Sequence, residues 1–564
     1  MNLRSYLPPL GNVGLALLAA GLLILAFPDF ELWFLAWFAL VPLLWAIERQ
    51  SHCVYACALL GWIFGTAFFF GTCWWLTYAP IHYASVPWPL AYFLIFIVCV
   101  VAGLFPAIFT TILSVLLRRF GSKAFLAAPF VWVFTEFLRY WLIGNNWNAV
   151  GYSQAFSGRG LESSSIGGVL LVSFCVSVPS AVVAVLFLGE GALIRNSDFR
   201  TALKGIAINN SFSVFYTLTA EGRAESKRFF GATYDHAVTF FFIVLMILFA
   251  GGFFFLLYVV AGPNINATNG AFSQSLPNVV ALQPNVPMSG VTTAHLEHLR
   301  QKQVVAAELE LSRLSTDNRQ PTTVILPESP MNFMYNDDRE FQEFIGDFAR
   351  RNNVSVLFNS AEPDKLTGKY FNSAVMVGPD GREAVQYDKI YLLPFGEAVP
   401  PILEGIVPGF VGNFSYGGEY DLFPLGDAKA GVMICFESHF GQLSREYVRN
   451  GADVLIEMTN DGYLGPTPVL RQHLANAVFR AVETNRPVLR VTNVGITAYI
   501  SERGQVLDEV PSYTEATRVW SVAKSDGSQT FYVRYGDWFA WLCSIITVTL
   551  LLLCFRKRPK QQEA

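Results

Sequence analysis

The chain has 564 residues, of which 53% are hydrophobic and only 15% are charged. Soluble globular proteins carry about 25% charged residues, so this composition indicates that part of the chain lies in a membrane. The 49 Phe, 22 Tyr and 13 Trp residues supply ample surface for burial, which excludes an intrinsically disordered chain. A formal net charge of −4 gives no indication of a nucleic-acid-binding surface.

Stretches without charged residues locate the membrane part. Between Arg49 and Arg118 lie 68 consecutive residues without Asp, Glu, Lys or Arg. One transmembrane helix needs about 20 apolar residues, so this stretch holds at least two, divided near Pro80 and Pro87. No small-residue cleavage site follows the first apolar segment, so we do not interpret it as a cleavable signal. The apolar windows predict eight spans, at 10–28, 31–48, 53–77, 90–117, 124–143, 166–193, 237–261 and 537–555.

The distribution of Lys and Arg predicts the orientation of these spans. With a cytoplasmic N-terminus, the inner loops and the tail hold fifteen Lys and Arg residues, whereas the short outer loops hold only Arg159. Positive residues accumulate on the cytoplasmic side, so we expect both termini there. The predicted organisation is a seven-span domain at 1–261, an exported domain at 262–536, and a transmembrane helix with a basic tail at 537–564. The long inner loop at 195–236 carries no recognisable chemistry.

The exported stretch is predicted to be an α/β domain. Helical patterns at His295–Leu314 and Arg471–Asn485 alternate with short β-rich runs, which is typical of a sheet covered by helices. The expected strands are Val279–Gln283, Thr323–Leu326, Val354–Phe358, Ala430–Cys435, Val454–Met458, Val488–Thr492 and Arg518–Val522.

Cysteine usage singles out one residue. Seven of the eight cysteines lie in or beside predicted spans, where they act as small apolar residues, and only Cys435 lies in the exported domain. A single thiol excludes an internal disulfide in that domain. Cys435 closes the apolar run Ala430–Ile434, so it is either a buried residue at a strand end or a nucleophile displayed at a turn.

A cysteine nucleophile needs a base or a cationic neighbour, because a thiol near pH 7 is mostly protonated. Two other strand-end segments present such groups: TTVILPES at 322–329 presents Glu328 after an apolar run, and YDKIYLLPFGE at 387–397 presents Lys389 and Glu397. A Glu that accepts the thiol proton, a Lys that stabilises the oxyanion and a Cys that attacks form a complete acyl-transfer set. Glu328, Lys389 and Cys435 are therefore the predicted catalytic residues.

The three motifs LPES, YDKIYLLPFGE and ICFES, in this order, resemble the nitrilase superfamily. The resemblance covers most of 275–525 and includes TNDGYLG at 459–465 and RAVETNRPVLRVTNVGIT at 480–497. It implies an αββα sandwich in which Glu328 is the general base, Lys389 stabilises the oxyanion and Cys435 is the nucleophile.

The membrane half makes the resemblance more specific. TEFLRYW at 135–141 and NWNAVGYSQ at 146–154, attached to eight spans, resemble the bacterial apolipoprotein N-acyltransferase family. This implies that Cys435 takes an acyl chain from a phospholipid, usually phosphatidylethanolamine, and that a diacylated apolipoprotein accepts it on its N-terminal amine. It also implies an enzyme of the bacterial inner membrane, with a periplasmic catalytic domain and no cofactor or metal.

Two further acidic residues match the family pattern. Glu397 is expected to orient Lys389 or the incoming amine, and Glu437 lies two residues after the nucleophile. A structural salt bridge is the alternative for both. The sequence departs from the family at Phe436, where Tyr is usual, at Tyr463, where Trp is common, and at Val494, where Asn is common.

Two other features are candidates for lipid binding. Glu136 and Arg139 share one face of the fifth span, where ionisable residues are costly and usually functional. They either position a lipid head group or the acceptor, or they form a pair that locks spans together. Phe410 and Phe414 belong to an apolar, glycine-containing stretch after Pro400, which is either a mobile lid that admits acyl chains or plain packing on the transmembrane helices.

Three functions remain open from the sequence. The first is the N-acyltransferase, the second is a membrane-anchored amidase in which water resolves the thioester, and the third is a non-enzymatic lipid-binding paralogue. A simple amidase needs one anchor at most, so eight spans disfavour the second. The intact set of Glu328, Lys389 and Cys435 disfavours the third. His295 and His298 are not followed by the pattern of a third zinc ligand, so no metal site is expected.

Overall fold

The structure is a computed structural model that describes residues 6–158, 160–188, 276–290, 292–315, 320–328, 333–394, 396–399 and 414–555. The predicted span 237–261, the loop 195–236, the basic tail and Phe410 lie outside these residues. The predicted domain boundary near 261 lies there too, so the division of the chain into 1–261, 262–536 and 537–564 stays a prediction.

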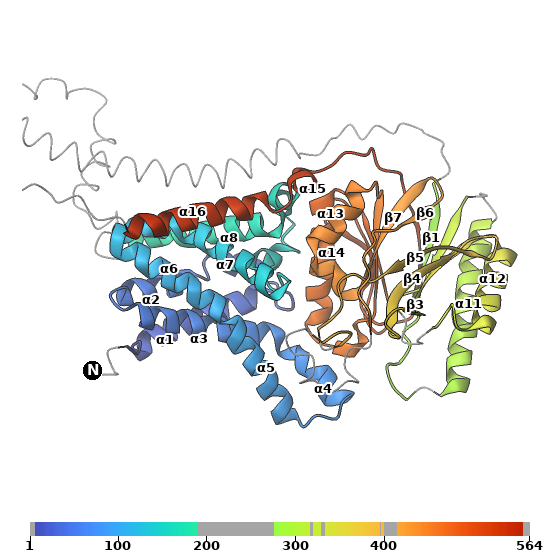
Figure 1. Cartoon of the computed structure of the whole chain (residues 1–564), viewed down its shortest axis with the longest axis horizontal. Helices are drawn as coiled ribbons and strands as arrows, with labels where there is room; N and C mark the ends of the chain where they lie inside the picture. Colours follow the sequence, from blue (N-terminus) through green and yellow to red (C-terminus); the bar gives the residue numbers. More distant parts are fainter. Residues whose placement is uncertain are drawn as a thin grey trace, which may run out of the picture.

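Apolar helices form the N-terminal part and the C-terminal end of the described chain (Figure 1). Within the described ranges, four helical stretches are long and apolar enough to cross a membrane: Val54–His82, Trp88–Ile143, Leu161–Phe187 and Trp538–Phe555. The helices are α1 (Leu10–Ala26), α2 (Val41–Gln50), α3 (Val54–Cys73), α4 (Tyr78–His82), α5 (Trp88–Ala102), α6 (Leu104–Phe120), α7 (Ala128–Ile143), α8 (Ser164–Phe187) and α16 (Trp538–Phe555).

Four predicted spans in the described chain are not single α-helices: 53–77 and 124–143 each include a 3-10 segment at one end, and two others divide internally. The predicted span 31–48 divides into a 3-10 turn, η2 (Trp33–Trp37), and α2, which begins beside Pro42. Proline lacks a backbone N–H and is tolerated in the first turn of a helix, so it starts a new helix here. The predicted span 90–117 divides at Gly103 into α5 and α6. Pro106 lies in the first turn of α6, where its ring is incompatible with continuous α-helix through the preceding turn.

Two six-stranded sheets form the second half, in the orders β12-β1-β2-β3-β4-β5 and β11-β10-β9-β8-β7-β6. β1, β2 and β3 run parallel in the first sheet, and β7, β8 and β9 run parallel in the second. The strands are β1 (Asn278–Gln283), β2 (Thr322–Ile325), β3 (Ser355–Pro363), β4 (Tyr370–Val377), β5 (Glu383–Asp388), β6 (Leu422–Leu425), β7 (Ala428–Ile434), β8 (Val454–Thr459), β9 (Val488–Thr492), β10 (Thr497–Ile500), β11 (Val506–Val510) and β12 (Ala516–Ser521).

Helices cover both outer faces of the sheet pair. Helices α11 (Thr293–Ser315) and α12 (Arg339–Asn352) lie on the first sheet, at the far end of the molecule from the apolar helices (Figure 1). Helices α13 (Gly441–Arg449) and α14 (Val469–Thr484) lie between the second sheet and the apolar helices (Figure 1). The expected αββα sandwich is confirmed.

The core of the sandwich lies between the two sheets. Val279, Ile325 and Leu357 of the first sheet and Val432 and Ile456 of the second are fully buried in one hydrophobic cluster. This cluster continues into the apolar helices, so one connected core extends from the sheets to the membrane part.

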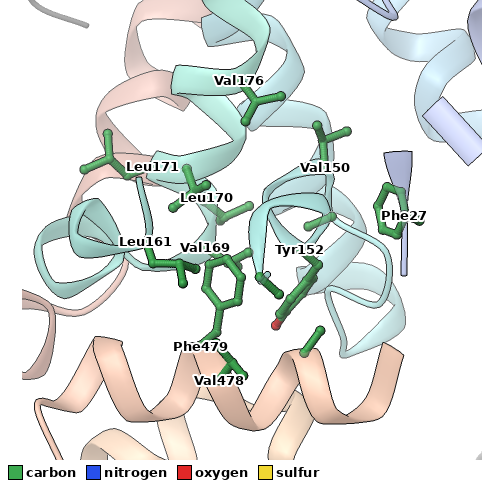
Figure 2. Close-up of a cluster of buried hydrophobic side chains, with 14 of the residues drawn as sticks. Phe27, Val150, Tyr152, Leu161, Val169, Leu170, Leu171, Val176, Val478 and Phe479 are labelled. Atoms are coloured by element: carbon green, nitrogen blue, oxygen red, sulfur yellow. The ribbon is translucent and has the colours of Figure 1, made fainter. Parts of the chain in front are cut away.

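Helix α14 joins the sandwich to the apolar helices. Almost all of its residues are buried, because one face covers the second sheet and the other faces α8. The Tyr152 and Phe479 rings meet edge to face, with centroids 4.9 Å apart. Figure 2 shows these rings beside Leu161, Val169 and Val478 at the junction.

A buried carboxylate ties α14 to a break in α8. Gly167 and Gly168 have non-helical backbone angles, so α8 is interrupted just before Val169. The Val169 N–H donates to Glu483 Oε1 at 3.0 Å, and Glu483 Oε2 lies 2.7 Å from Arg480 Nη2. Both charged side chains are 1% exposed. Glu483 therefore satisfies a backbone donor of the apolar helices and neutralises the charge of Arg480.

We expect the Glu483→Ala substitution to lower the free energy of unfolding by about 3–5 kcal/mol, because it leaves Arg480 charged and unpaired in the interior. Thermal and denaturant unfolding of the full chain in detergent micelles measures the effect. Glu446→Ala is the matched control, since Glu446 pairs with the half-exposed Arg449 and such pairs contribute less than about 1 kcal/mol. Equal losses in the two variants would contradict this account of the junction.

Candidate active site

The three predicted catalytic residues follow the ends of three strands. Glu328 comes three residues after β2, Lys389 directly follows β5, and Cys435 directly follows β7. The structure brings them together at one edge of the sandwich. Lys389 Nζ lies 3.8 Å from Glu328 Oε1, and the Cys435 thiol is within hydrogen-bonding reach of the Glu328 carboxylate.

The backbone turns sharply at Cys435. Its φ angle is +50°, in the left-handed region that residues other than glycine rarely adopt. The chain passes there from β7 directly into the 3-10 helix η9 (Cys435–His439). Strained backbone of this kind persists where the surroundings determine it, and it clusters at functional sites.

Lys389 is held between two carboxylates. Its side chain is 1% exposed, and its Nζ atom lies 2.8 Å from Glu397 Oε1 as well as 3.8 Å from Glu328. Burial by itself lowers the pKa of a lysine, but the charges of Glu397 and Glu328 outweigh it and raise the pKa of Lys389. The ammonium group therefore stays charged, which suits it to stabilise an oxyanion.

Glu328 is placed by two donors. Asn372 Nδ2 donates to its Oε1 atom at 3.2 Å, and the Asn460 backbone N–H donates to its Oε2 atom at 3.1 Å. Burial raises the pKa of Glu328, Lys389 lowers it, and the nearby Glu397 raises it further, so the pKa lies above its ordinary value. A carboxylate with a raised pKa is a better general base for a thiol than an exposed one.

The Cys435 thiol stays mostly protonated near neutral pH unless a neighbouring group accepts its proton. Burial and the negative charge of Glu328 raise the pKa of Cys435 well above its ordinary value. The sulfur therefore becomes nucleophilic only as its proton passes to Glu328. With Lys389 beside it, the arrangement can perform acyl transfer through a thioester.

The two supporting acidic residues occupy different places. Glu397 contacts the reacting groups: it lies against Lys389, and its Oε1 atom also accepts from Asn372 Nδ2 at 2.5 Å. Glu437 is fully buried and accepts hydrogen bonds from Tyr387 Oη and from three backbone N–H groups, those of Ile390, Tyr391 and Ile434. Burial raises the pKa of Glu437 to about 7.

Glu437 therefore braces the site. Its carboxylate joins the start of the nucleophile turn to the segment that follows Lys389, which sets the distance between Lys389 and Cys435. Roles for Glu397 and Glu437 in the reaction stay predictions.

The lipid-binding candidates Glu136 and Arg139 are buried in α7. Glu136 Oε1 accepts from the Val150 backbone N–H at 2.8 Å, and Arg139 Nη1 donates to the Trp147 carbonyl at 2.5 Å. Both residues thus fasten the loop after α7, whose Trp147 ring stacks on His439 of η9 with centroids 4.0 Å apart.

Beside this pair is a cavity of about 20 Å³, roughly the room for one water molecule. Phe414 is half-buried, and its backbone N–H donates to the Glu397 carbonyl at 3.2 Å. Lipid contacts of Glu136, Arg139, Phe410 and Phe414 stay predictions.

The three positions that depart from the family pattern differ in how far they are exposed near the site. Phe436 is buried against His439 and Phe440, and Val494 is buried. Tyr463 is 48% exposed, and its ring meets Tyr83, which follows α4, with centroids 6.0 Å apart. Tyr83 Oη also donates to the Gly462 carbonyl, so the apolar helices contribute to the surroundings of the site.

Sequence reasoning missed several residues of the site. Asn372 lies on β4, a strand that was not predicted, and His473 and Arg490 reach the floor of the site from α14 and β9. Asp461 was visible only as part of TNDGYLG. These residues share only one signal in the sequence, a polar side chain among apolar neighbours. That signal is common in any sequence, so it does not identify site residues before the fold is known. In the described part of the chain, no cluster of His, Cys, Asp or Glu is arranged to hold a metal ion.

Comparison with known proteins agrees with both halves of the chain. The family model described as the apolipoprotein N-acyltransferase N-terminal domain matches residues 19–182, and the carbon-nitrogen hydrolase model matches residues 318–530. Apolipoprotein N-acyltransferase of Geobacter metallireducens is 29% identical, over 96% of this chain and 95% of that protein. The enzyme of the same name from Photobacterium profundum is 25% identical, over 99% of this chain and 98% of that protein.

Among solved structures, an amidase from Nesterenkonia sp. is 14% identical and covers 48% of this chain and 96% of its own, with a TM-score of 0.35. The first family model covers most of the apolar helices but not α16, and the second covers most of the sandwich but not β1 or α11. The similarity to the named relatives runs through both parts. The chain is therefore similar to apolipoprotein N-acyltransferases over nearly its whole length, and its second half matches the carbon-nitrogen hydrolase family model.

Proposed function

We propose that this protein transfers an acyl chain from a membrane phospholipid, through a thioester on Cys435, to the N-terminal amine of a diacylated apolipoprotein. The observation that carries the proposal is the meeting of Glu328, Lys389 and Cys435 at one edge of the sandwich, on a chain whose relatives carry this activity in their names.

The position of the site supports a lipid donor. Residues around the nucleophile contact the apolar helices directly: Trp147 stacks on His439, and Tyr83 contacts Gly462 and Tyr463. A phospholipid such as phosphatidylethanolamine then reaches the thiol without leaving the membrane. The Lys and Arg distribution supports placing the sandwich on the periplasmic side, with both termini in the cytoplasm.

In the first half-reaction, Glu328 accepts the Cys435 proton as the sulfur bonds to the ester carbonyl carbon of the phospholipid. The charge that develops on the carbonyl oxygen faces the Lys389 ammonium. When the ester C–O bond breaks, Glu328 returns the proton to the departing alkoxide. The products are an acyl thioester on Cys435 and a lysophospholipid.

In the second half-reaction, the amine of the apolipoprotein attacks the thioester carbonyl and passes a proton to Glu328. The C–S bond breaks, and the thiolate of Cys435 takes that proton back. A thioester is readily attacked by an amine, so two easier steps replace one difficult aminolysis.

Intact-mass spectrometry of the full chain, incubated with phosphatidylethanolamine in detergent, tests the proposal. We expect a mass gain of one acyl chain that a diacylated lipopeptide discharges, and none in a folded Cys435→Ala variant. Cys53→Ala is the matched control and keeps the adduct. Discharge of the adduct by water alone would indicate a hydrolase, and a persistent adduct in Cys435→Ala would refute Cys435 as the nucleophile.

The Lys389→Met substitution is expected to slow thioester formation by about 10²–10³-fold, because it removes one oxyanion-stabilising group while keeping a side chain of similar length. Single-turnover kinetics measures the loss. Lys429→Met, at an exposed position of β7, controls for loss of a lysine charge and retains the wild-type rate. A wild-type rate in Lys389→Met would remove Lys389 from the mechanism.

The raised pKa of Glu328 predicts how the rate of thioester formation falls on the acid side of its pH profile. Glu328 accepts a proton only when ionised, so thioester formation is absent at low pH and rises as the pH passes through a value above the ordinary 4.5. Glu328→Gln should abolish both the reaction and this acid-side fall while the protein stays folded. An unchanged fall in that variant would assign it to another group.

A further inference from the structure

Four buried ionisable residues lie beneath the nucleophile turn, and the reaction steps above use none of them. They come from four elements: Glu457 from β8, Asp461 from η10 (Asp461–Leu464), His473 from α14 and Arg490 from β9. All four side chains are at most 4% exposed. Burying charges is costly, so a cluster of this kind needs mutual pairing and a reason to be there.

His473 is the centre of this cluster. Its Nδ1 atom lies 2.7 Å from Asp461 Oδ1, and its Nε2 atom lies 3.1 Å from Glu457 Oε1. Arg490 pairs with both carboxylates, through Nη2 to Asp461 at 2.8 Å and through Nη1 to Glu457. Two carboxylates thus face two cations.

The cluster is fully ionised near neutral pH. Burial alone would suppress each charge, but Asp461 and Glu457 raise the pKa of His473 to about 9. Arg490 and His473 in turn hold the pKa of Asp461 down at about 2 despite its burial. Another titratable neighbour is His439, stacked on His473 with centroids 5.2 Å apart; Asp461 also acts on Tyr513 and Cys435. Burial and the charge of His473 hold the pKa of His439 well below its ordinary value, so it stays neutral.

The cluster reaches the nucleophile by two routes. His473 Nε2 lies 3.1 Å from the carbonyl oxygen of Cys435, the residue with the left-handed backbone. Thr459 Oγ1 donates to Asp461 Oδ1 at 3.3 Å and is also within hydrogen-bonding reach of the Cys435 thiol. Asp461 is one of the negative charges that disfavour the thiolate.

We propose that His473 is a positioning residue for Cys435, which fixes the nucleophile turn through the Cys435 carbonyl and neutralises Asp461 so that negative charge can form on the sulfur. The inference rests on the proposed role of Cys435 as the nucleophile. If His473 loses its positive charge, the negative charge of Asp461 beside the thiol is no longer balanced by it, and the thiolate becomes harder to form. If Asp461 loses its charge as well, this effect on the thiolate is removed.

The test measures thiolate formation without any lipid. Iodoacetamide alkylation of Cys435 in the detergent-solubilised full chain is followed across pH by mass spectrometry of the peptide that contains it. We expect His473→Gln to move the midpoint of alkylation upward by about one pH unit. Asp461→Asn should move it downward, and the double variant His473→Gln/Asp461→Asn should return it close to the wild-type value.

The controls separate positioning from loss of fold. His298→Gln, on the exposed face of α11, should leave the midpoint unchanged, and thermal unfolding checks that each variant is folded. If His473→Gln does not fold, the comparison of Asp461→Asn with the double variant still decides the matter, because only the double variant removes His473. An unmoved midpoint in both single variants, or a double variant no closer to wild type than His473→Gln, would overturn the proposal. Failure of acyl transfer with normal alkylation profiles would count against the proposed function alone.

Discussion

The structure depends on one buried lysine that two carboxylates keep charged. Lys389 lies at the end of a strand of the first sheet, and an ammonium group in this position is tolerated only because Glu328 and Glu397 lie within 4 Å of it. The two carboxylates balance the ammonium charge of Lys389, and this charge is in place to stabilise an oxyanion. Cys435 comes from the second sheet, so the two sheets must meet at this edge with fixed spacing.

Buried acids supply that spacing. Glu437 collects four donors and ties the nucleophile turn to the segment after Lys389. On the opposite side, Asp461, Glu457, His473 and Arg490 form a neutral set of charges under the same turn. A left-handed Cys435 is costly for a residue with a Cβ atom, and these contacts from several elements are what hold it.

The apolar helices are part of the same construction. Helix α14 covers the second sheet with one face and α8 with the other, and Glu483 supplies an acceptor to the break in α8. Trp147, fastened by Arg139, stacks on His439 directly behind the nucleophile turn. The apolar helices therefore form one side of the candidate active site, in addition to anchoring it, which is consistent with the lipid donor that we propose.

The sequence by itself determined the class of fold and the apolar helices, and it singled out Glu328, Lys389 and Cys435 as candidate catalytic residues, because uncharged runs and short motifs are local patterns. It predicted β2, β7, β8 and β9 closely, did not predict β4, β5, β6, β10 or β11, and merged α5 with α6. Only the tertiary structure decided that Asn372 donates to both Glu328 and Glu397, that Glu437 ties the nucleophile turn to the segment after Lys389, and that His473 and Arg490 lie under Cys435. These contacts join elements that are distant along the chain, and no local pattern of apolar and polar residues specifies which of them meet.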